Sequence, residues 1–336
     1  MRYRNLLLLL LGGRLVVAAA PPAGYYDSAQ GKAGGELRTA LHNLIRNHHV
    51  IPYSSSGFDT SDALKILDAD PGNASNVLLI YGTDSVSAST FGLTTGWNRE
   101  HQWCNSYGID SVGPAYSDLF NLRAVDANVN SSRGNKYYDF SDTNSAGYKL
   151  PAHAEAPLCS TDSDSWQPPV FDWGNIARSM FYMAIRYTGD ATNEPVLVLT
   201  DNTALIQSSN YYMGDLSTLL AWHSADPVDT AEQLRNDQVY SLYQTNRNPF
   251  VDHPEWVNLT FAPAHTNPPI LNIEMLAARA VLSWLATNQS CHLEFSTNSA
   301  STWLTVTNTP MLTNSQFRVS LTTDTPSVWF RLRVQQ

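Results

Sequence analysis

Two short segments of the chain carry side chains that could hydrolyse a phosphodiester bond. Glu100 and His101 are adjacent in the first segment, and Asn130 and Arg133 lie in the second. A histidine suits the role of general base near neutral pH, so His101 is the candidate to deprotonate an attacking water. Such a hydrolysis also needs a cation that stabilises negative charge on the transition state and on the leaving oxygen. The residue types therefore predict metal-assisted phosphoryl transfer to water.

Magnesium is the cation that fits the remaining donors. Mg²⁺ prefers oxygen ligands and keeps several of its waters, so one carboxylate and one amide oxygen suffice to hold it. We therefore predict that Glu100 and Asn130 bind Mg²⁺, with Mn²⁺ or Ca²⁺ as substitutes. Arg133 would add a bidentate contact to a phosphate, and Arg99 and Arg123 are its rivals for that role.

A strand and a short helix are expected to position the second segment. Leu119, Leu122 and Val125 indicate a strand, and Asp126 is a good N-cap for a helix that contains Asn130. That helix would project Asn130 one turn in, where its carboxamide oxygen could face the end of a strand.

Apolar periodicity predicts the other elements of an α+β domain. Residues 36–46 and 175–187 each place their apolar side chains on one helical face. Asp229 and Glu232 form a capping-box pattern that opens a further helix over residues 229–243. Residues 76–81 predict a buried strand, and residues 141–172, rich in Ser, Asp, Pro and Ala, predict a long surface loop.

The composition changes near residue 262. Residues 263–269 predict a linker between a first domain, residues 21–262, and a C-terminal module, residues 270–336. In the module the apolar period switches to two, with Phe330, Leu332 and Val334 alternating with Arg331 and Arg333. We expect a small all-β, sandwich-like module.

The N-terminal residues 1–20 have the pattern of a signal peptide. Arg2 and Arg4 supply positive charge, an apolar run covers residues 6–11, and residues 18–20 are alanines suited to cleavage. The run is too short to span a membrane, and no other stretch approaches about 18 consecutive apolar residues. We expect an exported protein, extracellular or periplasmic, that is monomeric and has no membrane span.

Three cysteines indicate an exported protein that depends little on disulfides. Cys104 and Cys159 could pair within the first domain, while Cys291 lies far downstream. One thiol is therefore left over.

Taken in order, these segments resemble the bacterial endonuclease I family of periplasmic and extracellular nucleases, which is built around the ββα-metal (His-Me finger) motif. The order and the spacing of the matching segments agree together. These segments are residues 24–26 with the helix at Leu37, and residues 97–101, 118–135, 176–187, 222–223 and 246–254.

The resemblance implies a role for each candidate residue. His101 corresponds to the family's general base, and Glu100 and Asn130 to its metal ligands. It implies cleavage of DNA, and often RNA, that leaves 5′-phosphates and has little sequence preference, because such enzymes grip the backbone. Contacts to the nucleic acid are expected from Arg99, Trp103, Asn121, Arg123 and Asn135.

Two positions depart from many relatives. Phe120 stands where a histidine is common, and Cys104 stands where a proline is common. Neither is the predicted base or a predicted metal ligand, so the departures bear on loop geometry and substrate preference.

Charge is the property that fits a nuclease least. The chain has a formal net charge of −10, and residues 97–140 contain no basic stripe of the kind usual in nucleic-acid binders. A bound divalent cation would add positive charge at the site itself. We therefore expect weak, strongly salt-sensitive substrate binding, with the rate coming from the metal and the geometry.

Two other functions fit parts of the sequence. An exported protein could bind a surface or polymer through its C-terminal module and carry an inactive nuclease-like domain, although Glu100, His101 and Asn130 are all present. A sequence-specific nuclease could also use the ββα-metal motif, although no recognition helix or zinc module is recognisable. The prediction is a secreted Mg²⁺-dependent endonuclease that acts on DNA and RNA, with a module that binds a surface or polymer or is only a spacer.

Overall fold

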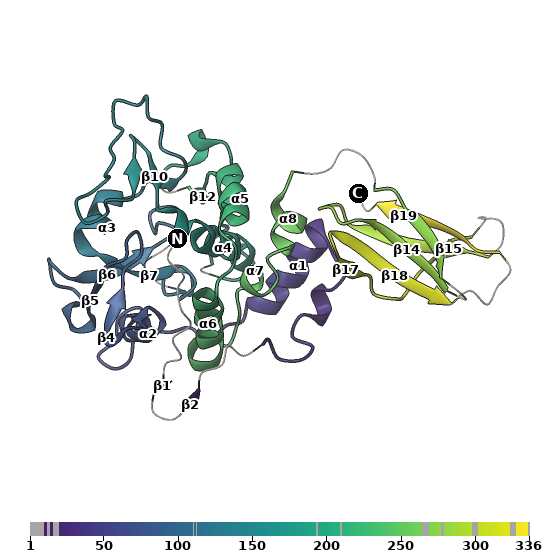
Figure 1. Cartoon of the computed structure of the whole chain (residues 1–336), viewed down its shortest axis with the longest axis horizontal. Helices are drawn as coiled ribbons and strands as arrows, with labels where there is room; N and C mark the ends of the chain where they lie inside the picture. The colour runs from purple at the N-terminus through teal and green to yellow at the C-terminus, as the bar shows by residue number, and fades with distance from the viewer. Residues whose placement is uncertain are drawn as a thin grey trace. The chain divides into compact units, whose positions relative to one another are not determined.

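A computed structural model describes most of the chain (Figure 1). The described residues are 10–11, 14–15, 20–109, 111, 113–192, 194–208, 210–263, 269–276, 279–297, 302–322 and 327–334. The predicted signal peptide lies outside these ranges except for residue 20 and the paired strands β1 (Leu10–Leu11) and β2 (Arg14–Leu15). Residues 264–268 of the predicted linker also lie outside them.

Contacts divide the chain into two compact units. The first unit comprises residues 1–21, in so far as they are described, and residues 45–252. The second combines residues 22–44 with residues 253–336, so the N-terminal part of the predicted first domain groups with the C-terminal residues. Each unit is described by itself.

Six α-helices and a π-helix are described wholly within residues 45–252, and one of the six is α3 (Ala127–Arg133). The long helix α4 buries Ile176, Met180, Phe181 and Ala184, as its period predicts, and packs beside α5 (Figure 1). Helix α6 starts where Asp229 accepts a hydrogen bond from the Glu232 amide at 2.8 Å, but the predicted helix over 229–243 continues as a π-helix. The bounds are α2 (Thr60–Leu67), α4 (Val170–Arg186), α5 (Leu216–Ala225), α6 (Thr230–Gln238), η4 (Val239–Gln244) and α7 (Pro249–Asp252).

The strands of this unit form small sheets. Strands β3 (Ala69–Asp70), β4 (Asn73–Leu78) and β5 (Ser85–Ser87) form one sheet, and β6 (Trp97–His101) pairs antiparallel with β7 (Leu122–Asp126). Strands β8 (Tyr137–Tyr138), β10 (Ser165–Gln167) and β9 (Ser160–Thr161) form another, and β11 (Val198–Leu199) pairs with β12 (Tyr212–Met213). Short 3₁₀ turns η2 (Ala88–Thr90) and η3 (Thr203–Leu205) complete the unit.

One apolar cluster holds the central strands together. Leu64 of α2, Val77 of β4, Trp97 of β6, and Leu122 and Ala124 of β7 are all fully buried in it. Burial of such side chains is the main favourable term in folding, so this cluster anchors the β6–β7 pair that carries the candidate site.

Two expectations about local structure need correction. The strand predicted at residues 76–81 ends at Leu78, because beyond it the backbone amides of Leu79 and Ile80 bond to Asp84 and Ala124 instead. The surface loop predicted at 141–172 contains strands β9 and β10 and the start of α4. Some of its polar residues, such as Asp162 and Ser165, are buried. They can be buried because they form hydrogen bonds with each other: the Asp162 carboxylate accepts the Ser165 amide at 2.7 Å.

The second unit contains the predicted all-β module. Its described strands form two antiparallel sheets, ordered β13-β14-β18-β17 and β16-β15-β19. Phe317 and Val319 are buried and alternate with exposed residues, as the period of two predicts. The strands are β13 (Asn272–Leu276), β14 (Arg279–Leu285), β15 (Cys291–Ser296), β16 (Leu304–Thr305), β17 (Met311–Thr313), β18 (Gln316–Thr322) and β19 (Trp329–Val334).

Residues 22–44 and the start of the C-terminal segment add helices to the second unit. These are η1 (Asp27–Ala29), α1 (Gly34–Ile45), whose final residue falls in the first unit, and α8 (Trp256–Phe261). Among the residues that the structure describes, no helix is both long enough and apolar enough to cross a membrane.

Candidate active site

Strands β6 and β7 and helix α3 (Ala127–Arg133) bring the predicted site residues together. Asp126 ends β7 and caps α3, because its Oδ1 accepts hydrogen bonds from the amides of Asn128 at 2.8 Å and Val129 at 3.0 Å. This confirms the predicted N-cap. Helix α3 contacts both strands, and Asn130 lies one turn into the helix.

Asn130 is tied to β6 by its amide nitrogen. Nδ2 donates to Oδ1 of Asn98 at 2.7 Å and to the carbonyl oxygen of Arg99 at 3.1 Å. A backbone carbonyl only accepts, so these bonds determine which end of the carboxamide is nitrogen. The Oδ1 atom of Asn130 is thereby the end of the carboxamide that bonds to neither Asn98 nor Arg99.

Glu100, His101 and Asn130 line one pocket of about 250 Å³. The pocket is also lined by residues of the loop after β6 and of the end of α3: Arg99, Cys104, Asn105, Arg133, Gly134 and Asn135. Segments separated in the sequence by the whole of β7 thus meet at one place.

His101 is held in one tautomer and one orientation. Its Nε2 lies 2.8 Å from the carbonyl oxygen of Tyr116, which can only accept, so Nε2 carries the proton and Nδ1 is the basic nitrogen of the neutral ring. The rings of Tyr116 and Tyr53 stack on the imidazole at centroid distances of 4.8 Å and 5.5 Å. Burial, aided by the charges of Arg99 and Arg133 and opposed by the Tyr116 bond, lowers the pKa of His101 to about 4. The ring is therefore neutral, the form that a general base requires.

Glu100 is 2% exposed and is bonded through one carboxylate oxygen. Oε1 accepts hydrogen bonds from the hydroxyl of Tyr81 at 2.6 Å and from Nη1 of Arg133. Burial raises the pKa of Glu100, and the charge of Arg133 opposes that rise. Glu100 lines the pocket, and these two donors both bond to Oε1 rather than to the second oxygen, Oε2.

Arg133 is 1% exposed and is engaged by the protein. Besides Glu100, it donates to the backbone carbonyls of His101 at 2.9 Å and Gln102 at 2.8 Å, and its guanidinium lies 4.4 Å from the ring centroid of Tyr138. Both terminal nitrogens are therefore used, and a bidentate phosphate contact would have to displace these bonds.

The two rival arginines lie in different surroundings. Arg99 is half-buried, lines the pocket, and stacks at 3.5 Å over the ring of Tyr53. Arg123 donates to Asp68 at 3.0 Å and is not among the residues that line the pocket. Arg99 also uses both terminal nitrogens: Nη1 donates to the Tyr53 carbonyl and to Oγ1 of Thr60 at 2.9 Å, and Nη2 donates to Ser54 at 3.3 Å. Of these three bonds only the one to Ser54 is exposed, so Nη2 of Arg99 is favoured over the other two arginines for a phosphate contact at the pocket.

Of the other residues expected to contact nucleic acid, only Asn135 is exposed at the pocket. Trp103 and Asn121 are fully buried, and they bond to each other through the Trp103 backbone. Trp103 also donates from Nε1 to the Tyr107 carbonyl at 3.0 Å. These two side chains are core residues with no free surface for a substrate.

The two residues that depart from the pattern of the family that the sequence resembles, Phe120 and Cys104, are both buried. Phe120 packs on Tyr182 at a centroid distance of 4.5 Å, and Cys104 lines the pocket. Burial raises the pKa of the Cys104 thiol to about 11, so it stays protonated near neutral pH. Cys104, Cys159 and Cys291 are all free thiols, so the pairing considered for the first two is not formed.

Four tyrosines at the site were not predicted from the sequence. Tyr53 and Tyr116 stack on His101. Tyr81 and Tyr138 are buried and bonded to each other through their hydroxyls, and the Tyr81 hydroxyl also bonds to Glu100. They lie in loops and in a short strand outside the chemically informative segments. A lone tyrosine carries no spacing signal, so only the fold reveals these contacts.

The donor set fits a hard divalent cation. Within the described ranges, no group of three or more His, Cys, Asp or Glu side chains is arranged to hold a metal. The pocket instead offers one carboxylate oxygen from Glu100 and one oriented amide oxygen from Asn130. This oxygen-only set suits Mg²⁺, which retains several waters.

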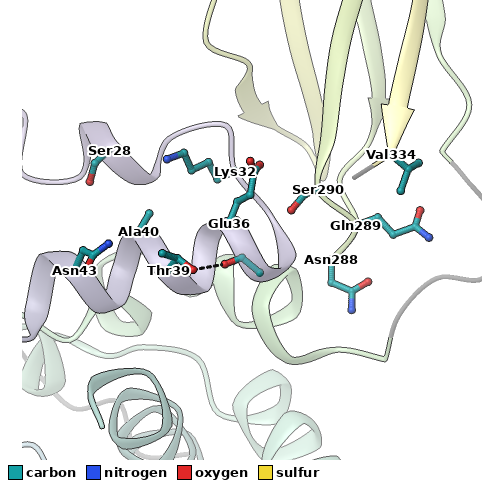
Figure 2. A pocket seen from close by; sticks show the side chains of 11 residues that line it. Ser28, Lys32, Glu36, Thr39, Ala40, Asn43, Asn288, Gln289, Ser290 and Val334 are labelled. Carbon is teal, nitrogen blue, oxygen red and sulfur yellow. Dashed lines mark hydrogen bonds between the residues drawn. The ribbon is translucent and has the colours of Figure 1, made fainter. Parts of the chain in front are cut away.

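A larger pocket of about 750 Å³ lies within the second unit (Figure 2). Polar side chains of α1 and of the loop after β14 line it, and its carboxylate, Glu36, is 3.4 Å from His292. Lys32 is its other charged lining residue. It offers no pairing of a base with metal ligands comparable to that at His101.

Comparison with known proteins gives consistent matches. The family model described as Endonuclease I matches residues 33–255, which include every lining residue of the candidate site. The chain is 43% identical over 237 residues to the extracellular ribonuclease of Bacillus subtilis (strain 168), covering 70% of this chain and 77% of that protein. It is 44% identical over 237 residues to the extracellular ribonuclease of Bacillus amyloliquefaciens, covering 70% and 76%.

Proposed function

Because the chain belongs to the endonuclease I family, we propose that it is a secreted, Mg²⁺-dependent endonuclease that hydrolyses RNA and DNA. The family expected from the sequence is thus confirmed. The observation that carries the proposal is the convergence of Glu100, His101 and Asn130 on one pocket. In this proposal β6, β7 and α3 form the ββα-metal motif.

His101 is the general base. Its unprotonated Nδ1 takes a proton from the attacking water, and the new P–O bond forms as the bond to the 3′-oxygen breaks, which leaves a 5′-phosphate. The Tyr116 carbonyl holds the Nε2 proton at 2.8 Å and stabilises the imidazolium that forms. The stacked rings of Tyr53 and Tyr116 keep the imidazole from rotating.

Glu100 and Asn130 would hold the cation through Oε2 and Oδ1. When bound, Mg²⁺ supplies a Lewis acid that stabilises charge on the phosphate and on the leaving 3′-oxygen. Asn98 orients the Asn130 amide at 2.7 Å, so that ligand needs little reorganisation.

Arg99 is the proposed phosphate contact. It lies at the pocket and its Nη2 reaches Ser54 through a bond of 3.3 Å at the exposed end of the side chain. Such an exposed bond is exchanged for a phosphate oxygen at little cost. Backbone contacts of this kind carry no sequence information, which fits an enzyme with little sequence preference.

The names of the relatives support the proposed substrate and location. Both Bacillus proteins are named extracellular ribonucleases, which supports RNA as a substrate and export from the cell. Cleavage of DNA rests on the family alone. Binding of a surface or polymer by residues 270–336, and a monomeric state, stay predictions.

Cleavage of RNA and plasmid DNA by the mature protein tests the proposal. We expect cutting with Mg²⁺, none with EDTA, 5′-phosphate ends of mixed sequence, and loss of cutting in His101→Ala. Absence of cutting by the wild-type protein with any divalent metal would refute it. The alternative of an inactive nuclease-like domain would then be favoured.

A further inference from the structure

A pair of buried tyrosines lies directly behind the candidate metal ligand. The hydroxyl of Tyr81 is 2.6 Å from Oε1 of Glu100 and 2.6 Å from the hydroxyl of Tyr138. Both tyrosines are at most 1% exposed, so neither hydroxyl can exchange its partner for water. The mechanism proposed above uses neither of them.

The available protons determine which group donates in the Tyr81–Glu100 bond and in the Tyr138–Tyr81 bond. An ionised carboxylate only accepts, so Tyr81 donates to Glu100, and Tyr138 must then donate to Tyr81. Arg133 donates to the same Oε1 atom. Two strong donors therefore hold Oε1, and Oε2 is the oxygen left for a cation.

Arg133 alone would not fix the rotation of the Glu100 carboxylate. Its Nη1 donates to the same Oε1 atom that accepts the Tyr81 hydroxyl. If Tyr81 released Oε1, Arg133 would be the one donor left on this atom among the described residues, and the carboxylate could turn about that bond and direct Oε2 away from the pocket.

The position of Tyr81 is itself strongly determined. Its backbone has φ of 74°, a left-handed conformation that is uncommon for a residue with a large side chain. Its amide donates to Asp172 at 2.9 Å, and its ring meets that of Trp166 at a centroid distance of 5.5 Å. Uncommon backbone conformations persist where surrounding contacts over-determine them, and they cluster at functional sites.

We propose that Tyr81, supported by Tyr138, is a positioning residue that keeps Oε2 of Glu100 directed into the pocket and thereby sets the affinity of the site for Mg²⁺. The inference rests on the proposed function, since it takes Glu100 as a metal ligand. Groups that orient a metal ligand without touching the metal typically change metal affinity by about 10–100-fold when removed.

Metal binding by the full-length mature protein, without nucleic acid, is the first readout. Calorimetric titration with Mg²⁺, or electron paramagnetic resonance with Mn²⁺, gives the Kd for wild type, Tyr81→Phe and Glu100→Gln. We expect the Kd of Tyr81→Phe to rise by about 10-fold or more. In cleavage assays the Mg²⁺ concentration for half-maximal rate should rise in parallel, with kcat at saturating Mg²⁺ within about 2-fold of wild type.

Tyr187→Phe is the matched control. Tyr187 is another fully buried tyrosine that donates to a carboxylate, Asp118, at 2.7 Å, but it is not part of the pocket lining. It should lose a comparable hydrogen bond and keep the wild-type Kd for the metal. If Tyr81→Phe fails to fold by circular dichroism, Tyr138→Phe replaces it, because that variant removes the supporting bond and keeps the Tyr81 hydroxyl.

The outcomes separate the inference from the function on which it depends. If Glu100→Gln bound the metal with the same Kd as the wild-type protein, the proposed metal site itself would be overturned. A site that needs Glu100 but binds metal equally well in Tyr81→Phe, or in Tyr138→Phe where it is the variant used, would overturn only the positioning role. If Tyr187→Phe weakened metal binding as much as Tyr81→Phe, the loss of affinity would be a general effect of lower stability. That result would also overturn the positioning role of Tyr81.

Discussion

Replacement of Asp172 by asparagine should make the stability of the protein less dependent on pH. Asp172 is buried at the start of α4, where its Oδ2 accepts the Tyr81 amide at 2.9 Å. Burial raises the pKa of Asp172 to about 7, and the charge of Arg123 and the Tyr81 bond only partly oppose that rise. Asparagine keeps an acceptor oxygen for Tyr81 and cannot ionise.

The sign and size follow from proton linkage. The folded state binds the Asp172 proton more tightly than the unfolded chain, so the contribution to stability is fully present below about pH 4 and is lost as the pH rises to about 7. A pKa of about 7 against about 3.9 for an unperturbed aspartate corresponds to roughly 4 kcal/mol once the group is ionised in both states. Because Asp172 is 7% exposed, little of this is screened by solvent.

Urea unfolding between pH 4 and pH 8 measures the effect. The free energy of unfolding of Asp172→Asn minus that of wild type should be near zero at pH 4 and should grow by a few kcal/mol by pH 8. Asp164→Asn, at an exposed aspartate, controls for the loss of one negative charge. A difference between Asp172→Asn and wild type that stays constant across this range would refute the reasoning.

Three further predictions concern the site. His101→Ala should lower the cleavage rate about 10²–10⁴-fold while keeping the wild-type Kd for Mg²⁺ in titrations, because the base is not a metal ligand. Arg133→Gln should lower the free energy of unfolding in urea by about 3–5 kcal/mol, because it leaves Glu100 buried without its charged partner; a stable, weakly binding variant would instead mark Arg133 as a substrate contact. Arg99→Gln should raise KM and reduce the slope of log affinity against log salt by about 1, with little change in urea unfolding; an unchanged slope would exclude a phosphate contact.

Several arginines form ion pairs inside the fold and are not available to attract a nucleic acid. Arg178 pairs with Glu232 at 2.6 Å, Arg186 with Glu194 at 2.8 Å, and Arg235 with Asp68 at 3.0 Å. These guanidiniums are almost fully buried, so they add nothing to the field that a polyanion meets. Attraction of substrate at the site then depends on the bound cation and a few exposed groups, which supports the expectation of weak, salt-sensitive binding.

Local patterns in the sequence predicted the elements that carry the site. The cap at Asp126, the strand before it and the helix that contains Asn130 all depend on neighbours within a few residues, and all are confirmed. The family and the all-β character of the C-terminal module also followed from the order of motifs and from the period of two. By contrast, the polar composition of residues 141–172 predicted exposure wrongly, because composition does not report which backbone groups a side chain will satisfy.

What the sequence by itself determined is which residue types are present for the proposed chemistry: an imidazole at His101 as the candidate base and side-chain oxygens at Glu100 and Asn130 as the candidate ligands. Only the tertiary structure decided how they are held. The tautomer of His101 depends on the Tyr116 carbonyl, and the free oxygen of Glu100 depends on Tyr81 and Arg133. It also decided that Trp103 is a core residue. The reason is physical: burial and the partner of each polar atom arise from contacts between distant segments, and no local pattern encodes which segments will meet.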